Sequence, residues 1–352
     1  MKKLLIIVTL VTSFYSLQRI NDYSELSEMI FVNSMGVDYD NNKKEFIIYF
    51  YILNNYNLAI PDISSSNNED ASYINVGRGK TIDEAINLIK NNSNLMFHFS
   101  NTQTFIIKNT FCINDNLEQL CHYILNSNEV VPNAVIFFTD DEIKDIYQIT
   151  TYSQTSSYFT LIVNSMTQNN YLKVYFNELC KDVLTPNYTA VYPFIKVNED
   201  ILIEFEEPQK SIAVEGIAIL DNQNSCKSFL LDDYPFFIWL NPLSNTTQYF
   251  HFGSFKVKEY KISKKYKKDY FKIKIHISFY LTTNPLNITE LEALHMLYEE
   301  IYEELIKLYD FSKETNYDFY NINHLSYDKA NFTNTNIKIF INSREIKNES
   351  ID

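Results

Sequence analysis

Apolar and polar residues alternate in short runs along this chain, and the runs predict strands interleaved with helices. Residues 30–38 and 45–53 predict two strands, and the polar residues 40–44 between them predict the turn of a hairpin. Four further apolar runs predict strands, at residues 105–107, 134–138, 212–220 and 337–341. Helical spacing occurs at residues 82–89, 117–124, 143–146 and 171–184. Strands that alternate with helices indicate an α+β or α/β fold of several domains, in which helices flank mixed β-sheets.

The clearest alternation lies in residues 271–279, where apolar odd positions and polar even positions predict a half-buried strand. A long helix follows, because Thr289 and Glu292 have the spacing of a capping box. Its predicted apolar stripe is Leu291, Leu294, Tyr298, Ile301, Leu305 and Leu308. Glutamates are expected to face water at four positions, Glu299, Glu300, Glu303 and Glu304, with Glu303 placed to pair with Lys307.

Two earlier helix starts have the same capping-box spacing. Thr81 and Glu84 precede a helix whose predicted apolar face is Ile82, Ala85, Ile86 and Ile89. Thr139 and Glu142 predict a second cap, which leads into the helix at residues 143–146.

The N-terminus has the pattern of an export signal. Lys2 and Lys3 precede an apolar run over residues 4–11, which is shorter than the ~20 residues that a membrane span needs and has the size of a signal-peptide core. We therefore expect residues 1–16 to be a signal peptide or N-terminal anchor, and the alternative is a buried first strand. No other stretch of the sequence reaches membrane length.

Residues 198–209 are polar, acidic and contain a proline, and we interpret them as a linker between modules. The predicted division is an N-terminal module over residues 17–197 and a C-terminal domain over residues 210–346. Whether the first module divides again, into lobes at about 17–112 and 113–197, stays open.

Composition narrows the classes of function. Lysine and arginine number 30 against 44 acidic residues, so the net charge of −14 disfavours nucleic-acid binding. Five glycines in 352 residues disfavour glycine-dependent phosphate and dinucleotide sites. The sequence from Gly77 to Thr81 resembles the end of a phosphate loop, but Ile74 occupies the position of the required first glycine. We interpret Gly79 instead as the turn into the Thr81 cap.

No metal, cofactor or catalytic site is predicted. The six histidines lack metal-ligand spacing, and the four cysteines, Cys112, Cys121, Cys180 and Cys226, form no zinc pattern. We expect the cysteines to be small buried residues, although Cys112 and Cys121 are an alternative disulfide pair in an oxidising compartment. Two acidic clusters invite a metal-site interpretation, Asp140-Asp141-Glu142 and Asp232-Asp233. For the first of these, placement at the positive end of a helix dipole is the simpler explanation.

Residues 256–274 form a strongly basic segment within this acidic chain. Its candidate contact surface comprises Lys256, Lys258, Lys261, Lys264, Lys265, Lys267 and Lys268. One interpretation is a hairpin with a solvated outer face, since lysine commonly protects exposed sheet edges. The other is attraction to anionic lipid or to an acidic partner.

The order of several short motifs resembles the Ger(x)C family, the C subunits of bacterial spore nutrient-germinant receptors. The segments that carry the resemblance are Arg19-Ile20-Asn21-Asp22, Val32 with Gly36-Val37-Asp38, Gly79-x-Thr81-x-x-Glu84-Ala85, and Pro193 followed by Val214-Glu215-Gly216-Ile217-Ala218-Ile219. The strand at Phe271 and the helix at Thr289 are similar in placement to that family's C-terminal domain. The resemblance implies a structural role for Gly36, Gly79, Thr81, Glu84 and Gly216.

This resemblance implies a three-domain, non-enzymatic lipoprotein subunit on the outer face of the spore inner membrane. Such a subunit assembles with two polytopic partners, the A and B subunits, in a receptor that senses amino acids, sugars or nucleosides. Two positions depart from the family pattern: Phe14 occupies the place of the lipidated cysteine, and Asn101 stands where the family often has histidine. Lipidation is therefore not expected at this end, so either the apolar N-terminus or the partner subunits hold the protein at the membrane.

Two functions of other classes stay open. An exported solute-binding protein would need a pocket between two lobes. A secreted carbohydrate-active enzyme would need two carboxylates at hydrolase separation in a cleft.

Overall fold

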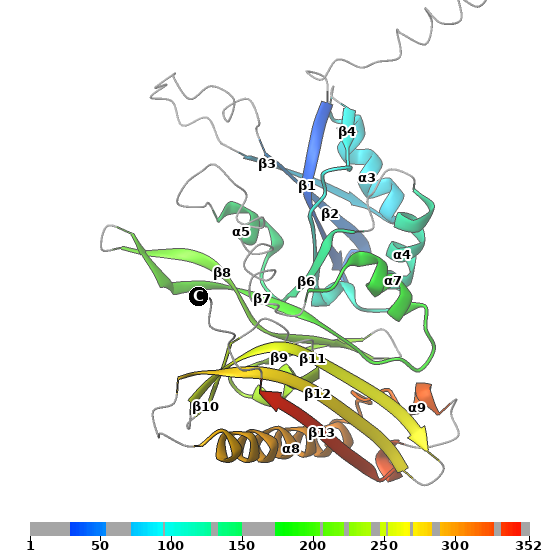
Figure 1. Ribbon diagram of the computed structural model, residues 1–352. Coiled ribbons are helices and arrows are strands. Elements are labelled where there is room, and N and C mark those ends of the chain that lie inside the picture. The colour runs from blue at the N-terminus through cyan, green and yellow to red at the C-terminus, as the bar shows by residue number, and fades with distance from the viewer. Residues whose placement is uncertain are drawn as a thin grey trace, which may run out of the picture.

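The strands of this protein assemble into two sheets (Figure 1). The computed structural model describes residues 29–53, 72–93, 96–127, 133–149, 173–204, 207–221, 225–240, 247–250, 253–267, 270–283, 289–326 and 332–345. The predicted signal segment, Phe14, the Arg19-to-Asp22 motif and Lys268 lie outside these residues.

The larger sheet occupies the upper part of Figure 1. Over the described residues it has the strand order β3-β2-β1-β5-β6-β7-β8-β9, with β4 also paired to β1. Its strands are β1 (Met29–Asp40), β2 (Glu45–Leu53), β3 (Ser72–Gly79), β4 (Met96–His98), β5 (Thr104–Lys108), β6 (Val135–Thr139), β7 (Ala190–Glu204), β8 (Glu207–Leu220) and β9 (Cys226–Leu230). The β1–β2 hairpin is antiparallel as predicted, whereas β1, β5 and β6 run parallel.

Helices cover both faces of the larger sheet. One face packs against α3 (Ile82–Asn91), α4 (Asn116–Asn126) and α7 (Phe176–Val183), and the other packs against α5 (Ile143–Gln148). The short 3₁₀ helix η2 (Asn109–Phe111) follows β5 on the three-helix face. The predicted α+β architecture is therefore confirmed.

The smaller sheet lies at the lower end of the molecule in Figure 1 and has the order β10-β11-β12-β13 in the described residues. Its strands are β10 (Thr247–Phe250), β11 (Gly253–Lys267), β12 (Tyr270–Thr283) and β13 (Ile337–Glu345). It is accompanied by η3 (Pro235–Leu240), α8 (Glu290–Thr315), α9 (Ile322–Leu325) and η4 (Phe332–Asn334). One face of this sheet shares a core with α8 and η3.

We call the core between the larger sheet and α3, α4 and α7 the upper core, and the core of the smaller sheet the lower core. Both cores include side chains of β8, because successive side chains of a strand point to opposite faces. Ile217 and Ile219 belong to the lower core, whereas Ala218 and Leu220 belong to the upper core. The described part of the predicted linker, residues 198–204 and 207–209, instead continues β7 and β8 as paired antiparallel strands, so its local structure was mispredicted. Strand-favouring isoleucines at positions 201 and 203 outweigh the acidic residues around them. The division of the chain into modules stays a prediction.

Two predicted helix caps are confirmed and one is wrong. The Thr81 hydroxyl accepts a hydrogen bond from the backbone of Glu84, and Thr289 forms a complete capping box with Glu292. Thr139 instead ends strand β6, and its hydroxyl accepts from the backbone N–H of Asp141. The N-cap of α5 is therefore Glu142 and not Thr139, whereas the helix begins at Ile143, as predicted.

Two other predicted helices differ in detail. The helix predicted over residues 171–184 begins only at Phe176, because Tyr175 still forms a β-bridge to Val135. On α8 the predicted stripe is wrong in its first turns: Leu291 is 79% exposed, and the buried positions there are Ala293 and Leu297. The buried residues continue through Ile301, Leu305 and Leu308, which keeps one face of the helix on the core.

The predicted glutamate face of α8 also needs one correction. Glu304 is buried rather than solvated, and it accepts from Lys307, which the sequence pattern pairs with Glu303. A three-residue spacing also places side chains side by side on a helix, so both pairings are sterically available.

Candidate functional site

The outer face of the smaller sheet gathers most of the basic segment. Because a bulge follows Val257 and alternation continues on each side of it, five β11 lysines face away from the α8 core: Lys256, Lys258, Lys261, Lys265 and Lys267. All except Lys256 are exposed. Lys272 and Lys274 of β12 and Lys338 of β13 lie on the same face, which we call the basic sheet face.

Strand register places three of these lysines in one row. Lys265 pairs with Lys272 across the β11–β12 hairpin, and Lys272 pairs with Lys338 across the parallel β12–β13 ladder. Directly opposed residues have Cβ atoms about 5 Å apart, and like charges at such positions destabilise a sheet. The fold therefore tolerates a repulsive arrangement at this position.

Aromatic rings contribute to the same face. The Lys272 Nζ atom lies 4.3 Å from the centre of the Phe340 ring, and the Lys338 Nζ atom lies 4.4 Å from that of Tyr270. Phe340 is 45% exposed. On β11, Glu259 forms an ion pair with Lys261. The basic sheet face thus combines lysines with exposed aromatic surface.

Among the predicted contact lysines that the structure describes, Lys264 is the exception, because it points inward. Its Nζ atom donates to the backbone oxygen of Phe319 at 3.4 Å and lies 5.7 Å from the centre of the Tyr320 ring. Burial lowers the pKa of Lys264 to about 8, and the charge of Asp318 acts in the opposite direction. Lys264 therefore belongs to the junction of the two cores and not to the exposed face.

A cavity of about 400 Å³ lies beside Lys264 at this junction. Both halves of the chain line it, with Asp182 and Tyr188 from the upper half and Phe319 and Asn321 from the lower half. Burial raises the pKa of Asp182 to about 6, although the Tyr192 hydroxyl donates to this carboxyl group. The lining of the cavity thus includes both a carboxyl group and an ammonium group, a combination that the sequence pattern did not predict.

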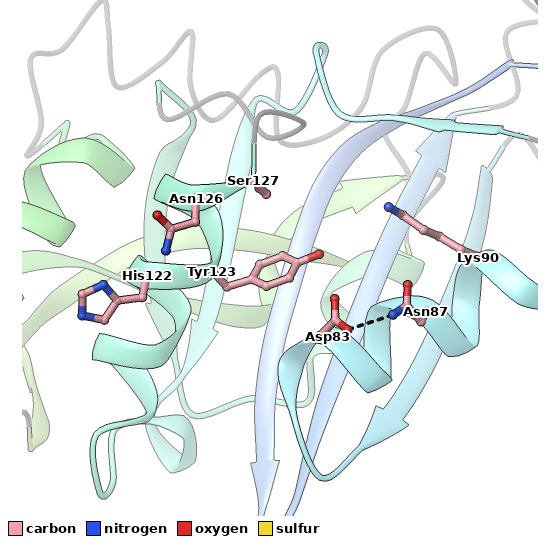
Figure 2. A pocket seen from close by; sticks show the side chains of 7 residues that line it. All are labelled: Asp83, Asn87, Lys90, His122, Tyr123, Asn126 and Ser127. Atoms are coloured by element: carbon pink, nitrogen blue, oxygen red, sulfur yellow. Dashed lines mark hydrogen bonds between the residues drawn. The ribbon is translucent and has the colours of Figure 1, made fainter.

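A second hollow, of about 630 Å³, opens between α3 and α4 (Figure 2). Figure 2 shows Tyr123 on α4 pointing toward α3, which carries Asp83, Asn87 and Lys90, whereas His122 on α4 points away. The Asn87 amide donates to Asp83 at 2.9 Å, and this bond holds both side chains on the helix surface. The residues that line this hollow all carry a polar group, and none of them was predicted to be functional.

The acidic cluster Asp140-Asp141-Glu142, which follows β6, is bonded to other parts of the fold. Asp140 accepts from Asn109 and from Ser228, and Asp141 accepts from the backbone N–H of Val197. Glu142 forms an ion pair with Lys108. No group of three histidine, cysteine or carboxylate side chains in the described part of the chain is placed to hold a metal ion.

The family-motif glycines lie at close approaches between elements. A Cβ atom added to Gly79 would lie 2.6 Å from the backbone nitrogen of Ala85, and one added to Gly216 would lie 2.3 Å from the backbone oxygen of Phe229. At Gly36 the added atom would lie 2.5 Å from a methyl group of Ile143. Glu84 accepts from the N–H of Lys80 at the start of α3. These contacts favour a structural role for the three glycines and for Glu84.

Within the described ranges, no helix combines the length and the hydropathy needed to cross a membrane. A family model described as the spore germination protein N-terminal domain matches residues 22–197, which is half of this 352-residue chain. Among solved structures, the chain is similar to one described as the crystal structure of the GerBC protein. That match has 12% sequence identity and a TM-score of 0.46, and covers 92% of this chain and 100% of the other. No curated protein sequence matches the chain.

Proposed function

The chain belongs to the Ger(x)C family of spore germination proteins, and on that premise we propose that it is a non-enzymatic subunit of a nutrient germinant receptor. In this proposal the protein is exported to the outer face of the spore inner membrane and assembles there with two polytopic partners, the A and B subunits. It turns over no substrate, and its contribution is to hold and align the other subunits.

The main observation in support of a membrane contact is the row of three lysines on the basic sheet face. Lys265, Lys272 and Lys338 repel one another in the isolated protein. An anionic bilayer surface removes that repulsion and attracts each nearby lysine by about 1 kcal/mol. The sheet presents these side chains on one face, which suits a surface extended in two dimensions.

Such a contact would also compensate for the missing lipid anchor, because Phe14 occupies the position of the family's lipidated cysteine. Stable membrane anchoring generally takes two signals, such as one acyl chain together with a basic patch. Without the acyl chain, the basic sheet face and the apolar N-terminal segment are the two signals that this sequence offers. The polytopic partners then supply the remaining affinity.

Vesicle sedimentation tests the membrane contact. The full chain is mixed with vesicles of neutral phosphatidylcholine and with vesicles that contain a third of anionic phosphatidylglycerol. We expect binding only to the anionic vesicles, and loss of most of it when Lys265, Lys272 and Lys338 are all changed to Gln. The matched control changes Lys43, Lys44 and Lys144 to Gln, since these lysines are also exposed and the net charge falls equally.

Equal binding by the two triple variants would exclude the basic sheet face as the membrane contact. Vesicle binding that survives in the row variant, together with lost co-purification of the polytopic subunits, would assign the row to a protein partner instead. Salt provides a further check, because an electrostatic contact weakens as the ionic strength rises.

The receptor role is tested in the spore-forming bacterium that encodes the protein. We expect a deletion strain to form spores that no longer respond to nutrients, and the wild-type copy to restore the response. Affinity purification from spore membranes should recover two polytopic proteins. Normal nutrient-triggered germination in the deletion strain would refute the proposal.

The junction cavity favours a second candidate, an exported solute-binding protein. Its volume of about 400 Å³ and its lining from both halves fit a pocket that encloses a small ligand. The two candidates differ in the partner that co-purifies: a solute-binding protein would bring down a transporter, whereas a receptor subunit would bring down germination proteins.

A further inference from the structure

The four cysteines of the chain are free thiols in the structure, and each thiol contacts another, which gives two pairs. Cys121 on α4 and Cys180 on α7 are both buried, and their thiols are hydrogen-bonded to each other. Cys226 begins β9 and is hydrogen-bonded to the thiol of Cys112. The second contact has independent support, because the Cys226 thiol also lies 3.3 Å from the side-chain oxygen of Asn109. Asn109 begins the turn whose last N–H is that of Cys112.

Only the fold brings these pairs together. Cys121 and Cys180 are 59 positions apart, and Cys112 and Cys226 are 114 positions apart. Burial as small apolar residues explains why each cysteine lies in or against the upper core, but it does not require every thiol to contact another thiol. Complete pairing of an even number of cysteines is what a disulfide framework produces.

We propose that Cys121–Cys180 and Cys112–Cys226 are the two native disulfides of this protein. In each pair two S–H bonds break, one Sγ–Sγ bond forms, and two protons and two electrons leave. The electron acceptor is the disulfide of a thiol–disulfide oxidant, which is itself reduced to two thiols. The presence of such an oxidant rests on the proposed export, whereas the identity of the pairs rests on the fold.

The surroundings of the thiols set when the bonds form. The hydrogen bond to Cys180, together with burial, raises the pKa of Cys121 above its ordinary value, and burial followed by the hydrogen bond to Cys112 does the same for Cys226. Because the thiolate is the reacting species, exchange is slow once the core has closed. The bonds therefore form while the chain folds, and afterwards they are protected from both oxidants and reductants.

The first bond would fix α4 to α7 over one face of the larger sheet. The second would fix the turn after β5 to the last strand of that sheet. Together they would join two helices of the covering layer and would link the turn after the middle strand β5 to the end strand β9. The sequence alone also allowed a Cys112–Cys121 disulfide. That pairing would leave Cys180 and Cys226 without a disulfide partner.

The test compares the full chain made in an oxidising secretory compartment with the same chain made in a reducing cytosol. Each sample is denatured in the presence of N-ethylmaleimide, and its intact mass and disulfide-linked peptides are measured. We expect the secreted protein to carry no label and to yield the two predicted linked peptides. The cytosolic protein should carry one label on every cysteine.

Single substitutions make the pairing falsifiable. Cys121→Ala should leave one reactive thiol, at Cys180, and keep the second bond; Cys226→Ala should leave Cys112 and keep the first. Full labelling of folded secreted protein would overturn the proposal, and so would linked peptides in any other combination. Circular dichroism establishes folding, and germination is no part of the measurement, so failure of the receptor proposal would leave this result intact.

Discussion

Asn321 offers the sharpest test of how the two halves of the molecule are joined. Its side-chain oxygen accepts from the N–H of Thr189 at 2.7 Å, and its amide nitrogen donates to the Thr189 carbonyl at 3.1 Å. Both residues are buried, with 6% and 8% of their surface exposed. Asn321 thus holds the start of β7 against the start of α9.

The change Asn321→Ala leaves two backbone groups of Thr189 without their partner. A buried unsatisfied group costs about 1–3 kcal/mol, and the adjoining cavity admits water, so about 2–3 kcal/mol applies to the pair. Asn321 also has a φ of 55°, and alanine in this left-handed region costs about 1 kcal/mol more than asparagine. The expected loss in the free energy of unfolding is therefore about 3–4 kcal/mol.

Asn316→Ala is the matched control. Asn316 has a φ of 60° at the end of α8 and is exposed, so its substitution should cost only about 1 kcal/mol, the backbone component. Both variants are unfolded in urea and followed by the fluorescence of Trp239, the single tryptophan, which is buried in the lower core. A difference below about 1 kcal/mol between the variants would refute the clamp, because a single orphaned group already costs that much.

The remaining predictions concern packing, pH and capping. Gly77→Ala should lower the unfolding temperature sharply, because the added Cβ atom would lie 1.9 Å from the backbone oxygen of Ala85; an unchanged temperature in calorimetry would contradict the packing. Asp182 has a folded pKa of about 6 against an ordinary 3.8, so its contribution to stability is full below about pH 4 and is lost as the pH rises through 6. Asp182→Asn should flatten that decline in urea titrations across this range, and an unchanged slope would assign it to another group. Thr289→Ala should cost about 1 kcal/mol in urea unfolding by removing the cap of α8, whereas Thr289→Ser should cost little.

Local patterns made much of the fold predictable. The hairpin of β1 and β2, the buried face of α3 and the alternation in β12 each depend on residues close in sequence. The errors arose where a tertiary contact outweighed a local signal. Thr139 has the spacing of a cap but remains in β6, and Leu291 has helical spacing but lies outside the core.

The candidate surface was predictable only in part for the same reason. The hairpin register that opposes Lys265 to Lys272 depends on a short turn, whereas Lys338 reaches the row by a parallel crossover that includes α8. No local pattern specifies that crossover register. Nor does spacing show that Lys264 turns inward, because the bulge after Val257 shifts the alternation by one residue.

The strand β8 has a mechanical consequence for the whole molecule. Because Ile217 and Ile219 serve one core while Ala218 and Leu220 serve the other, neither core can loosen without disturbing a strand that the other needs. A fragment that starts at residue 210 would keep this strand but lose its β7 partner, leaving apolar side chains and a hydrogen-bonding edge uncovered. Mechanical load on the smaller sheet accordingly reaches the larger sheet through β8, which is the property that the proposed scaffold role needs.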